Sequence, residues 1–142
     1  MGSRGGVRSG SGVLIQRRLA ARGFGGIRTA HGKVFTYVQG EGSRLTDLAR
    51  RANVTKQSMQ YLVDELERLG YAERIPAPHD RRAKLVRLTP RGREAVLVGR
   101  EAIAATERRW AQRLGSHKMA ELRLLLEELV ELIRAEGADG DR

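Results

Sequence analysis

Side chains that can bond DNA bases and phosphates are concentrated in one short stretch of this sequence. The candidate contacts are Thr55, Lys56, Gln57, Ser58, Gln60 and Tyr61. Gln57 and Gln60 carry amides, which can bond adenine in a bidentate way. Lys56 and the backbone N–H groups around it can bind phosphates, Ser58 can serve either purpose, and Tyr61 can reach a phosphate or pack beneath its helix. These residue types predict recognition of double-stranded DNA.

Helix signals on either side of a short turn predict how these side chains are presented. Thr46 can cap a first helix, and Asn53 tolerates the left-handed backbone that the turn 52–54 often needs. Thr55 can cap a second helix that ends before Gly70. Its apolar residues recur in steps of three or four, at Met59, Leu62, Val63, Leu66 and Leu69. The pattern predicts a helix-turn-helix, whose second helix meets base edges with its N-terminal half.

A basic hairpin is predicted directly after it, with strands at residues 71–75 and 84–88. The loop between them contains two prolines and is too long for a two-residue turn. Near its tip, Arg81 and Arg82 could enter a narrow A·T-rich minor groove, with Asp80 placed to orient one of them. A basic hairpin on its own is more often a solvated surface, but this position favours a DNA-binding wing.

The charge of the chain also indicates a polyanionic partner, either nucleic acid or an acidic membrane surface. The net charge is +10 and the pI is about 11.1. Residues 44–93 carry twelve basic and six acidic residues, whereas residues 115–142 carry four and seven. Secondary candidates for phosphate contacts are Arg44, Arg74, Lys84 and Arg87. We expect at least half of these four to be ordinary surface charge.

Composition argues against several other classes of protein. The 142 residues suit one domain, and the absence of cysteine removes disulfides and thiol chemistry. The apolar runs are too short to span a membrane, and no apolar secretory signal begins the chain, so a cytoplasmic protein is expected. Without a cysteine nucleophile, a phosphate-binding glycine loop or a metal-ligand cluster, we expect no enzyme, no cofactor and no metal.

Further helices are predicted on both sides of the helix-turn-helix and hairpin. Residues 13–22 form a short one, and Thr29 can cap the next, with candidate core residues Val34, Phe35, Tyr37 and Val38. Thr89 and Pro90 are a strong start for a helix that ends at about Leu114. Ser116 can cap the last helix. Its apolar seam is coiled-coil-like and consists of Met119, Leu122, Leu126, Leu129 and Ile133.

The expected fold is mainly α with a small β-hairpin wing (α+β). Its predicted parts are a flexible tail 1–12, supporting helices 13–43, a winged helix-turn-helix 44–93, dimerisation helices 94–136 and a tail 137–142. A monomer could fold the last helix back on its own core. A two-fold dimer would instead place two recognition helices at half-sites about one DNA turn apart, so we expect a homodimer.

Three groups of residues resemble the MarR family of bacterial and archaeal regulators. They are Leu45-Thr46-Asp47-Leu48-Ala49, Thr55-Lys56-Gln57-Ser58-Met59 and Leu66-Glu67-Arg68-Leu69-Gly70-Tyr71. The wing and the junction after it are similar as well, in Asp80-Arg81-Arg82 followed by Leu88-Thr89-Pro90-Arg91-Gly92. The resemblance is dense over residues 44–93 and covers about residues 13–134.

This resemblance implies a homodimeric winged helix-turn-helix protein that binds a pseudo-palindromic operator, usually as a repressor. It implies that Arg82 enters the minor groove, that Asp80 is its acidic partner and that residues 55–61 touch bases and phosphates. Many members release DNA when a small aromatic or phenolic compound binds. Candidate residues for such an effector pocket are Phe24, His31, Phe35, Tyr37 and Trp110, although aromatics at helical spacing are more often plain core.

Some features depart from the family, and other functions remain to be separated. The first helix is short and interrupted by glycines, which puts the usual N-terminal dimer contacts in doubt. Thiol sensing is excluded, and the three histidines are too far apart in sequence to suggest zinc sensing. The alternatives are an architectural DNA-binding protein that is indifferent to sequence and a winged helix used for protein–protein contact. The amides at Gln57 and Gln60 argue against the first, and the arginine-bearing wing argues against the second.

Overall fold

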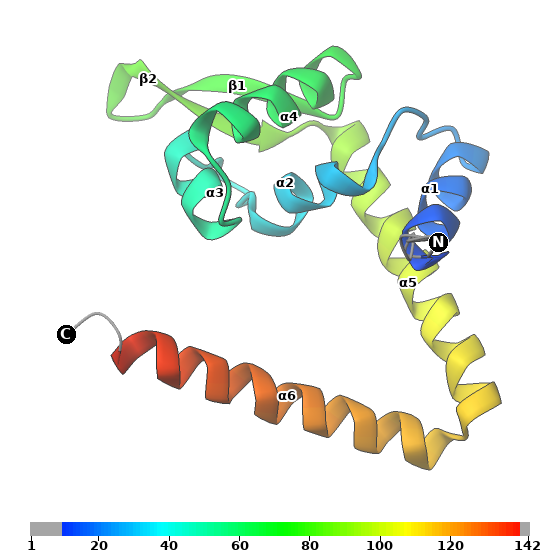
Figure 1. Cartoon of the computed structure of the whole chain (residues 1–142). Coiled ribbons are helices and arrows are strands. Elements are labelled where there is room, and N and C mark those ends of the chain that lie inside the picture. The colour runs from blue at the N-terminus through cyan, green and yellow to red at the C-terminus, as the bar shows by residue number, and fades with distance from the viewer. Residues whose placement is uncertain (1–9, 140–142) are drawn as a thin grey trace, which may run out of the picture. The chain divides into compact units, whose positions relative to one another are not determined.

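The computed structural model describes residues 10–139, and its elements are predominantly helical. The chain divides into two compact units, and the boundary lies between Ile103 and Ala104, within one long helix. The first unit joins helices to a two-stranded antiparallel hairpin, which confirms the predicted α+β class (Figure 1). None of the helices in the described part of the chain is long and apolar enough to cross a membrane.

The helix-turn-helix consists of α3 (Leu45–Arg51) and α4 (Lys56–Arg68). Two predicted local signals are confirmed: Asn53 has a φ of 51°, and the Thr55 hydroxyl accepts the Ser58 backbone N–H at 3.1 Å. The predicted apolar stripe of α4 is buried at Met59, Leu62, Val63 and Leu66. The prediction that Thr46 caps α3 is wrong. The cap position is Arg44, because Ser43 is bonded to Val86 of the hairpin and the helix starts directly after it.

The hairpin consists of β1 (Ala72–Ala77) and β2 (Asp80–Leu88). The prediction of a long loop is wrong, because Ala77 pairs with Asp80 and only Pro78 and His79 connect the strands. The pairing then jumps to Pro76 with Lys84, so residues 81–83 have no partner in the ladder and form a bulge. The bulge lies beside the turn, at the end of the hairpin that extends away from the helices (Figure 1).

The N-terminal part differs in detail from the prediction. It forms α1 (Gly10–Ala21), a 3-10 turn η1 (Thr29–His31) and α2 (Gly32–Tyr37). Helix α1 thus starts within the predicted tail 1–12, of which residues 1–9 lie outside the described residues. Thr29 is the first residue of η1 and not its cap, since Arg28 takes that position. Of the four candidate core residues, Val34 is fully buried, and Phe35, Tyr37 and Val38 are partly buried against the core.

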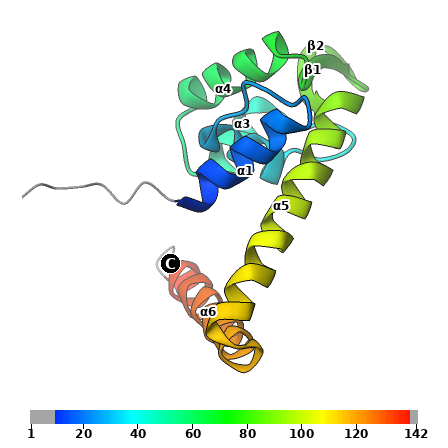
Figure 2. The ribbon, with the colours of Figure 1, turned by 90° about the vertical axis from the view of Figure 1, so that its right-hand side faces the viewer.

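Tyr71 is a core residue between α4 and β1, and the hairpin that follows it lies beside the start of α5 (Pro90–Leu114) (Figure 2). It is fully buried, and its N–H donates to the Leu66 carbonyl at 2.8 Å, at the end of α4. Its carbonyl accepts the Thr89 N–H at 3.1 Å, and its hydroxyl donates to the Gly25 carbonyl at 2.8 Å. The Arg91 guanidinium lies 4.9 Å from the centre of its ring. The backbone and side chain of this one residue therefore connect the recognition helix, the wing, α5 and the loop after α1.

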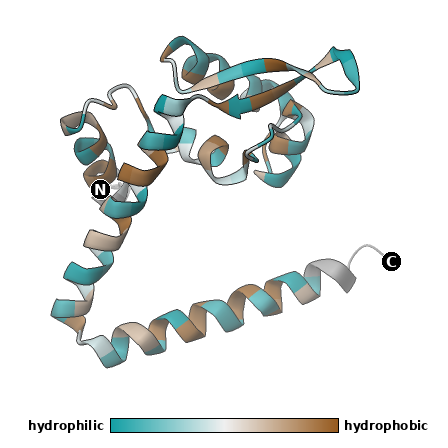
Figure 3. Cartoon of the chain, turned by 180° about the vertical axis from the view of Figure 1, so that it is seen from behind, coloured by the Kyte–Doolittle hydropathy of each residue, from teal (hydrophilic) through white to brown (hydrophobic). Residues whose placement is uncertain are grey.

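Helix α5 (Pro90–Leu114) has the predicted limits, whereas α6 (Ser116–Asp139) differs from the prediction at both ends. The Thr89 hydroxyl accepts the Gly92 N–H at 3.1 Å, which confirms the predicted start of α5. Helix α6 begins at Ser116 itself, so Gly115, with a φ of 92°, takes the cap position expected for Ser116. The helix continues to Asp139, inside the predicted tail 137–142; residues 140–142 of that tail are not described. Apolar and polar residues alternate along its length (Figure 3).

The close packing of α5 against Tyr71 leads to a first prediction. A Cβ atom on Gly92 would lie 2.0 Å from the backbone carbonyl oxygen of Tyr71, a contact that no side-chain rotation can relieve. We expect Gly92→Ala to lower the free energy of unfolding by about 1–3 kcal/mol or more, the cost of overpacking a filled interior. Urea denaturation at a fixed protein concentration measures it.

Gly99→Ala on the same helix is the matched control, because nothing lies within 4 Å of its added Cβ. An alanine there should stabilise α5 by about 0.5–1 kcal/mol. Equal effects of the two substitutions would contradict the packing described for Gly92.

Candidate nucleic-acid interface

The N-terminal half of α4 presents all six predicted contact residues on its exposed side. They are Thr55, Lys56, Gln57, Ser58, Gln60 and Tyr61. The Thr55 hydroxyl donates to the Ser58 hydroxyl at 2.8 Å, so these two side chains serve the helix start. Among the described residues, Lys56, Gln57 and Gln60 make no side-chain hydrogen bond or ion pair. Their amide and ammonium groups are therefore available to an outside partner.

A hollow that includes several charged and polar side chains lies between this helix and the wing. Its volume is about 390 Å³, and it is lined by Leu45, Lys56, Gln60, Asp64, Arg74, Lys84 and Val86. Lys56 and Gln60 come from α4, whereas Lys84 comes from β2, where it pairs with Pro76. The structure thus brings predicted recognition-helix and wing residues to one surface.

The tip of the wing carries Asp80, Arg81 and Arg82, all of them exposed. The Asp80 carboxylate accepts the backbone N–H of Arg82 at 3.0 Å. It therefore holds the backbone of the bulge, and not a guanidinium as the sequence suggested. Within the described part of the chain, the guanidinium groups of Arg81 and Arg82 make no ion pair. Both can reach outward from the end of the hairpin.

Two of the secondary phosphate candidates are engaged inside the unit. The side chain of Arg74 is only 22% exposed. It pairs with two carboxylates of α4, Asp64 at 2.6 Å and Glu67. The Arg87 side chain donates to Glu73 across the hairpin at 2.8 Å. These contacts fasten β1 to α4 and the two strands to one another. Arg44 and Lys84 are exposed.

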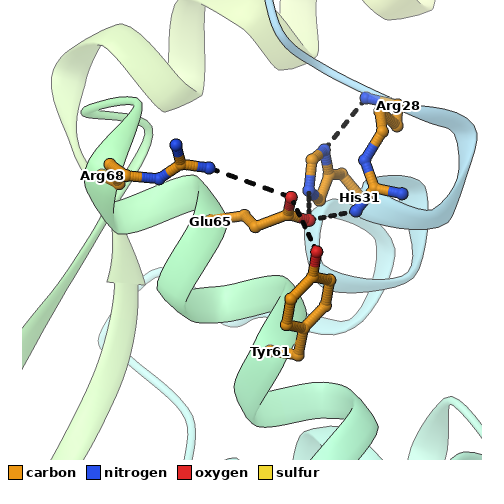
Figure 4. A network of polar contacts seen from close by, with 5 residues as sticks. All are labelled: Arg28, His31, Tyr61, Glu65 and Arg68. Carbon is orange, nitrogen blue, oxygen red and sulfur yellow. Dashed lines mark hydrogen bonds and ion pairs between the residues drawn. The ribbon is translucent and has the colours of Figure 1, made fainter.

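A network of polar contacts centred on Glu65 was not foreseen from the sequence (Figure 4). The Glu65 carboxylate is bound by Arg28, by His31 Nε2 at 3.1 Å, by the Tyr61 hydroxyl at 3.3 Å and, more distantly, by Arg68 at 3.9 Å. The hydrogen bond from Arg28 lowers the pKa of Glu65 below its usual value. Burial lowers the pKa of His31, which is fully enclosed.

The five effector-pocket candidates are not brought together. Phe24 packs against Tyr71, Tyr37 lies 5.7 Å below the Arg51 guanidinium, and His31 belongs to the Glu65 network. Trp110 lies in the second unit. Phe35 lines a cavity of about 440 Å³ in the first unit. The other walls of this cavity come from α1, η1 and the first part of α5, including Leu19, Ile27, Arg28, Thr29 and Arg100.

This architecture can be compared with known proteins. The sequence profile of the MarR family matches residues 26–83, which include α3, α4 and most of the hairpin. The solved structure of transcriptional regulator PA4135 superposes with a TM-score of 0.64 at 26% identity, over 85% of this chain and 88% of that one. Residues 26–83 are thus similar in sequence to the MarR family, and the fold is that of the MarR-type winged helix.

Two further solved structures have the same fold. Wild-type MarR from E. coli gives a TM-score of 0.68 at 22% identity and covers 84% of this chain and 87% of its own. FabT from Streptococcus pneumoniae, solved in complex with DNA, gives 0.68 at 21% identity, over 87% of this chain and 88% of that one. Comparison with curated proteins gave no match. Tyr71 and Gly92, which belong to two of the motifs that resemble the family, are in close backbone contact.

The buried histidine predicts a pH dependence of stability. Because the fold lowers the pKa of His31 below 6.5, the unfolded chain binds the proton more readily. The stabilising effect of neutral His31 is complete above pH 6.5 and is lost as the pH falls below that value. We expect the free energy of unfolding, measured in urea, to decrease between pH 7 and pH 5. The Glu65 carboxylate titrates lower, below its usual pKa of 4.5.

His31→Gln should flatten this pH dependence. His79→Gln is the control, because His79 is exposed at the turn of the hairpin and its replacement should leave the slope unchanged. A His31→Gln protein that loses stability between pH 7 and pH 5 as steeply as the wild type would contradict the assignment.

Proposed function

We propose that this chain is a homodimeric transcriptional repressor that binds a pseudo-palindromic operator and leaves it when a small effector binds. The observation that carries the proposal is the single basic surface formed by the recognition helix and the wing. Lys56, Gln57 and Gln60 are unengaged there, and Arg81 and Arg82 extend from the same unit. In this proposal residues 44–93 contact DNA, whereas residues 13–43 and 94–136 support the dimer.

The two parts of the surface suit different features of DNA. The amides of Gln57 and Gln60 offer the donor and acceptor pair that reads adenine in the major groove. Lys56 and Lys84 suit phosphates on either side of that groove. The arginines of the wing tip suit the negative potential of a narrow minor groove. FabT of S. pneumoniae, which has this fold, was solved in complex with DNA and supports the same use here.

The wing assignment predicts the effect of removing one arginine. Arg82→Ala should weaken operator binding by about 1–3 kcal/mol, the range of a groove contact. Fluorescence anisotropy with operator DNA at fixed salt measures the dissociation constant. Arg134→Ala, which removes the same charge from α6, should have little effect. Operator affinity unchanged by Arg82→Ala would rule out the wing contact.

Dimerisation is supported by the apolar side chains that α6 leaves uncovered. The exposed ones are Leu122, Leu124, Leu125, Leu126, Leu129, Val130, Leu132 and Ile133. Such a concentration of exposed leucine on one helix marks an association surface, because single chains rarely leave large apolar patches in water. The predicted seam at Leu122, Leu126 and Leu129 is part of it. A two-fold copy of this chain is the proposed occupant, since a pseudo-palindrome requires two reading heads.

This interface predicts a change of mass in solution. Leu126→Glu should shift the chain from dimer to monomer in sedimentation equilibrium, because it places a charge in the centre of the apolar surface. Glu128→Gln on the same helix is the control and should remain dimeric. A Leu126→Glu protein with the mass of a dimer would exclude α6 as the main interface.

The cavity of about 440 Å³ is the proposed effector site. Most of its lining is apolar, with Phe35 as the aromatic wall, and this size and composition suit a small aromatic compound. Its charged lining residues are Arg28 and Arg100, both cationic. A compound with a carboxylate or an ionised phenol would therefore be preferred over a neutral one.

A further inference from the structure

Glu65 connects the recognition helix to a segment that lies outside the helix-turn-helix. Tyr61 and Arg68 contact its carboxylate from α4 itself, at 3.3 and 3.9 Å. Arg28 and His31 contact it from the loop before η1 and from η1 (Figure 4). We call Glu65, Arg28 and His31 the Glu65 anchor, because these three residues attach the outer side of α4 to residues 28–31.

The hydrogen bonds of His31 determine which of its ring nitrogens carries the proton. The backbone N–H of Arg28 donates to His31 Nδ1 at 2.9 Å, so the proton of the neutral ring lies on Nε2. Nε2 can then donate to the Glu65 carboxylate at 3.1 Å. The Glu65 carboxylate on α4 thus binds the side chain of Arg28 directly and its backbone through His31.

Arg28 also belongs to the wall of the proposed effector cavity, together with its neighbours Ile27 and Thr29. The Thr29 hydroxyl accepts from the Gln16 amide of α1 at 2.9 Å, and both residues line the cavity. The side chain of Arg28 is 51% exposed, so its guanidinium can change partner without opening the core. It is the one member of the Glu65 anchor that lines the cavity.

We propose that Arg28 transmits the occupancy of the cavity to the recognition helix. This rests on the proposed function. An organic anion in the cavity binds the guanidinium of Arg28 with the help of Arg100 and competes with Glu65 for it. Glu65 then loses the ion pair that attaches α4 to residues 28–31. The side of α4 that carries Tyr61 is released, and the helix no longer keeps the position that matches the wing.

The test compares Arg28→Gln with Arg68→Gln. Both substitutions remove an arginine that pairs with Glu65, but Arg68 does not line the cavity. Sodium benzoate is the probe, and benzyl alcohol is its uncharged counterpart. Two measurements are made on each full-length protein: hydrogen exchange of the backbone amides in α4, and the dissociation constant for operator DNA. Thermal unfolding identifies any variant that fails to fold.

Benzoate should speed amide exchange in α4 and weaken operator binding about fivefold or more in the wild type and in Arg68→Gln. Arg28→Gln should show neither response, and benzyl alcohol should have no effect on any of the proteins. Glu65→Gln breaks the same ion pair from the helix side and should also be unresponsive, which covers the case of an unfolded Arg28→Gln protein.

Three results would overturn the proposal: a wild type that does not respond to benzoate, a folded Arg28→Gln that responds as Arg68→Gln does, or a benzyl alcohol response equal to that of benzoate. Exchange in α4 is measured without DNA. A chain that shows the exchange response but no specific DNA binding would therefore refute the proposed function and leave the role of Arg28 intact.

Discussion

The burial of Tyr71 is the constraint on which the first unit depends. Its backbone ends the recognition helix and begins the wing, and its carbonyl receives the N–H of Thr89, next to the start of α5. Gly92 must be glycine for α5 to approach that carbonyl, and Arg91 covers the ring from the same helix turn. The angle between recognition helix and wing is therefore set by a packed residue and not by a flexible loop. The proposed contact of helix and wing with two grooves of DNA needs such rigidity.

Electrostatics inside the unit complement this packing. The second half of the recognition helix carries Asp64, Glu65 and Glu67, which would repel DNA phosphates if they were unpaired. Arg74 from the wing neutralises the first and the third, and Arg28 neutralises the second. Two arginines that add to the positive charge of the sequence thus act within the fold, where they hold α4 to its neighbours. Among the described residues, Lys56 at the start of the helix and Arg81 and Arg82 at the tip of the wing make no ion pair, and a DNA-binding surface needs free cations at such positions.

The parts of this structure that sequence could predict are those determined by local signals. Thr55 starts the recognition helix as expected because its hydroxyl acts on a residue three positions away. Thr46 was predicted wrongly because the start of α3 is set by a bridge from Ser43 to the distant hairpin. The contact of Glu65 with His31 joins residues 34 positions apart, and neither residue type by itself indicates it. The helix-turn-helix and the exposure of its candidate contact residues were therefore predictable, whereas the contacts that join α4 to residues 28–31 were not.

Sequence-specific recognition by the chain can be tested by selecting genomic DNA fragments with the purified protein at physiological salt and footprinting the best site. We expect one enriched motif, with a protected pseudo-palindrome whose half-sites lie about one helical turn apart. Protection should extend into the minor groove beside each half-site, where the wing arginines would lie. Uniform enrichment with no motif would contradict the account, and would make the chain an architectural DNA-binding protein whose recognition helix reads no sequence.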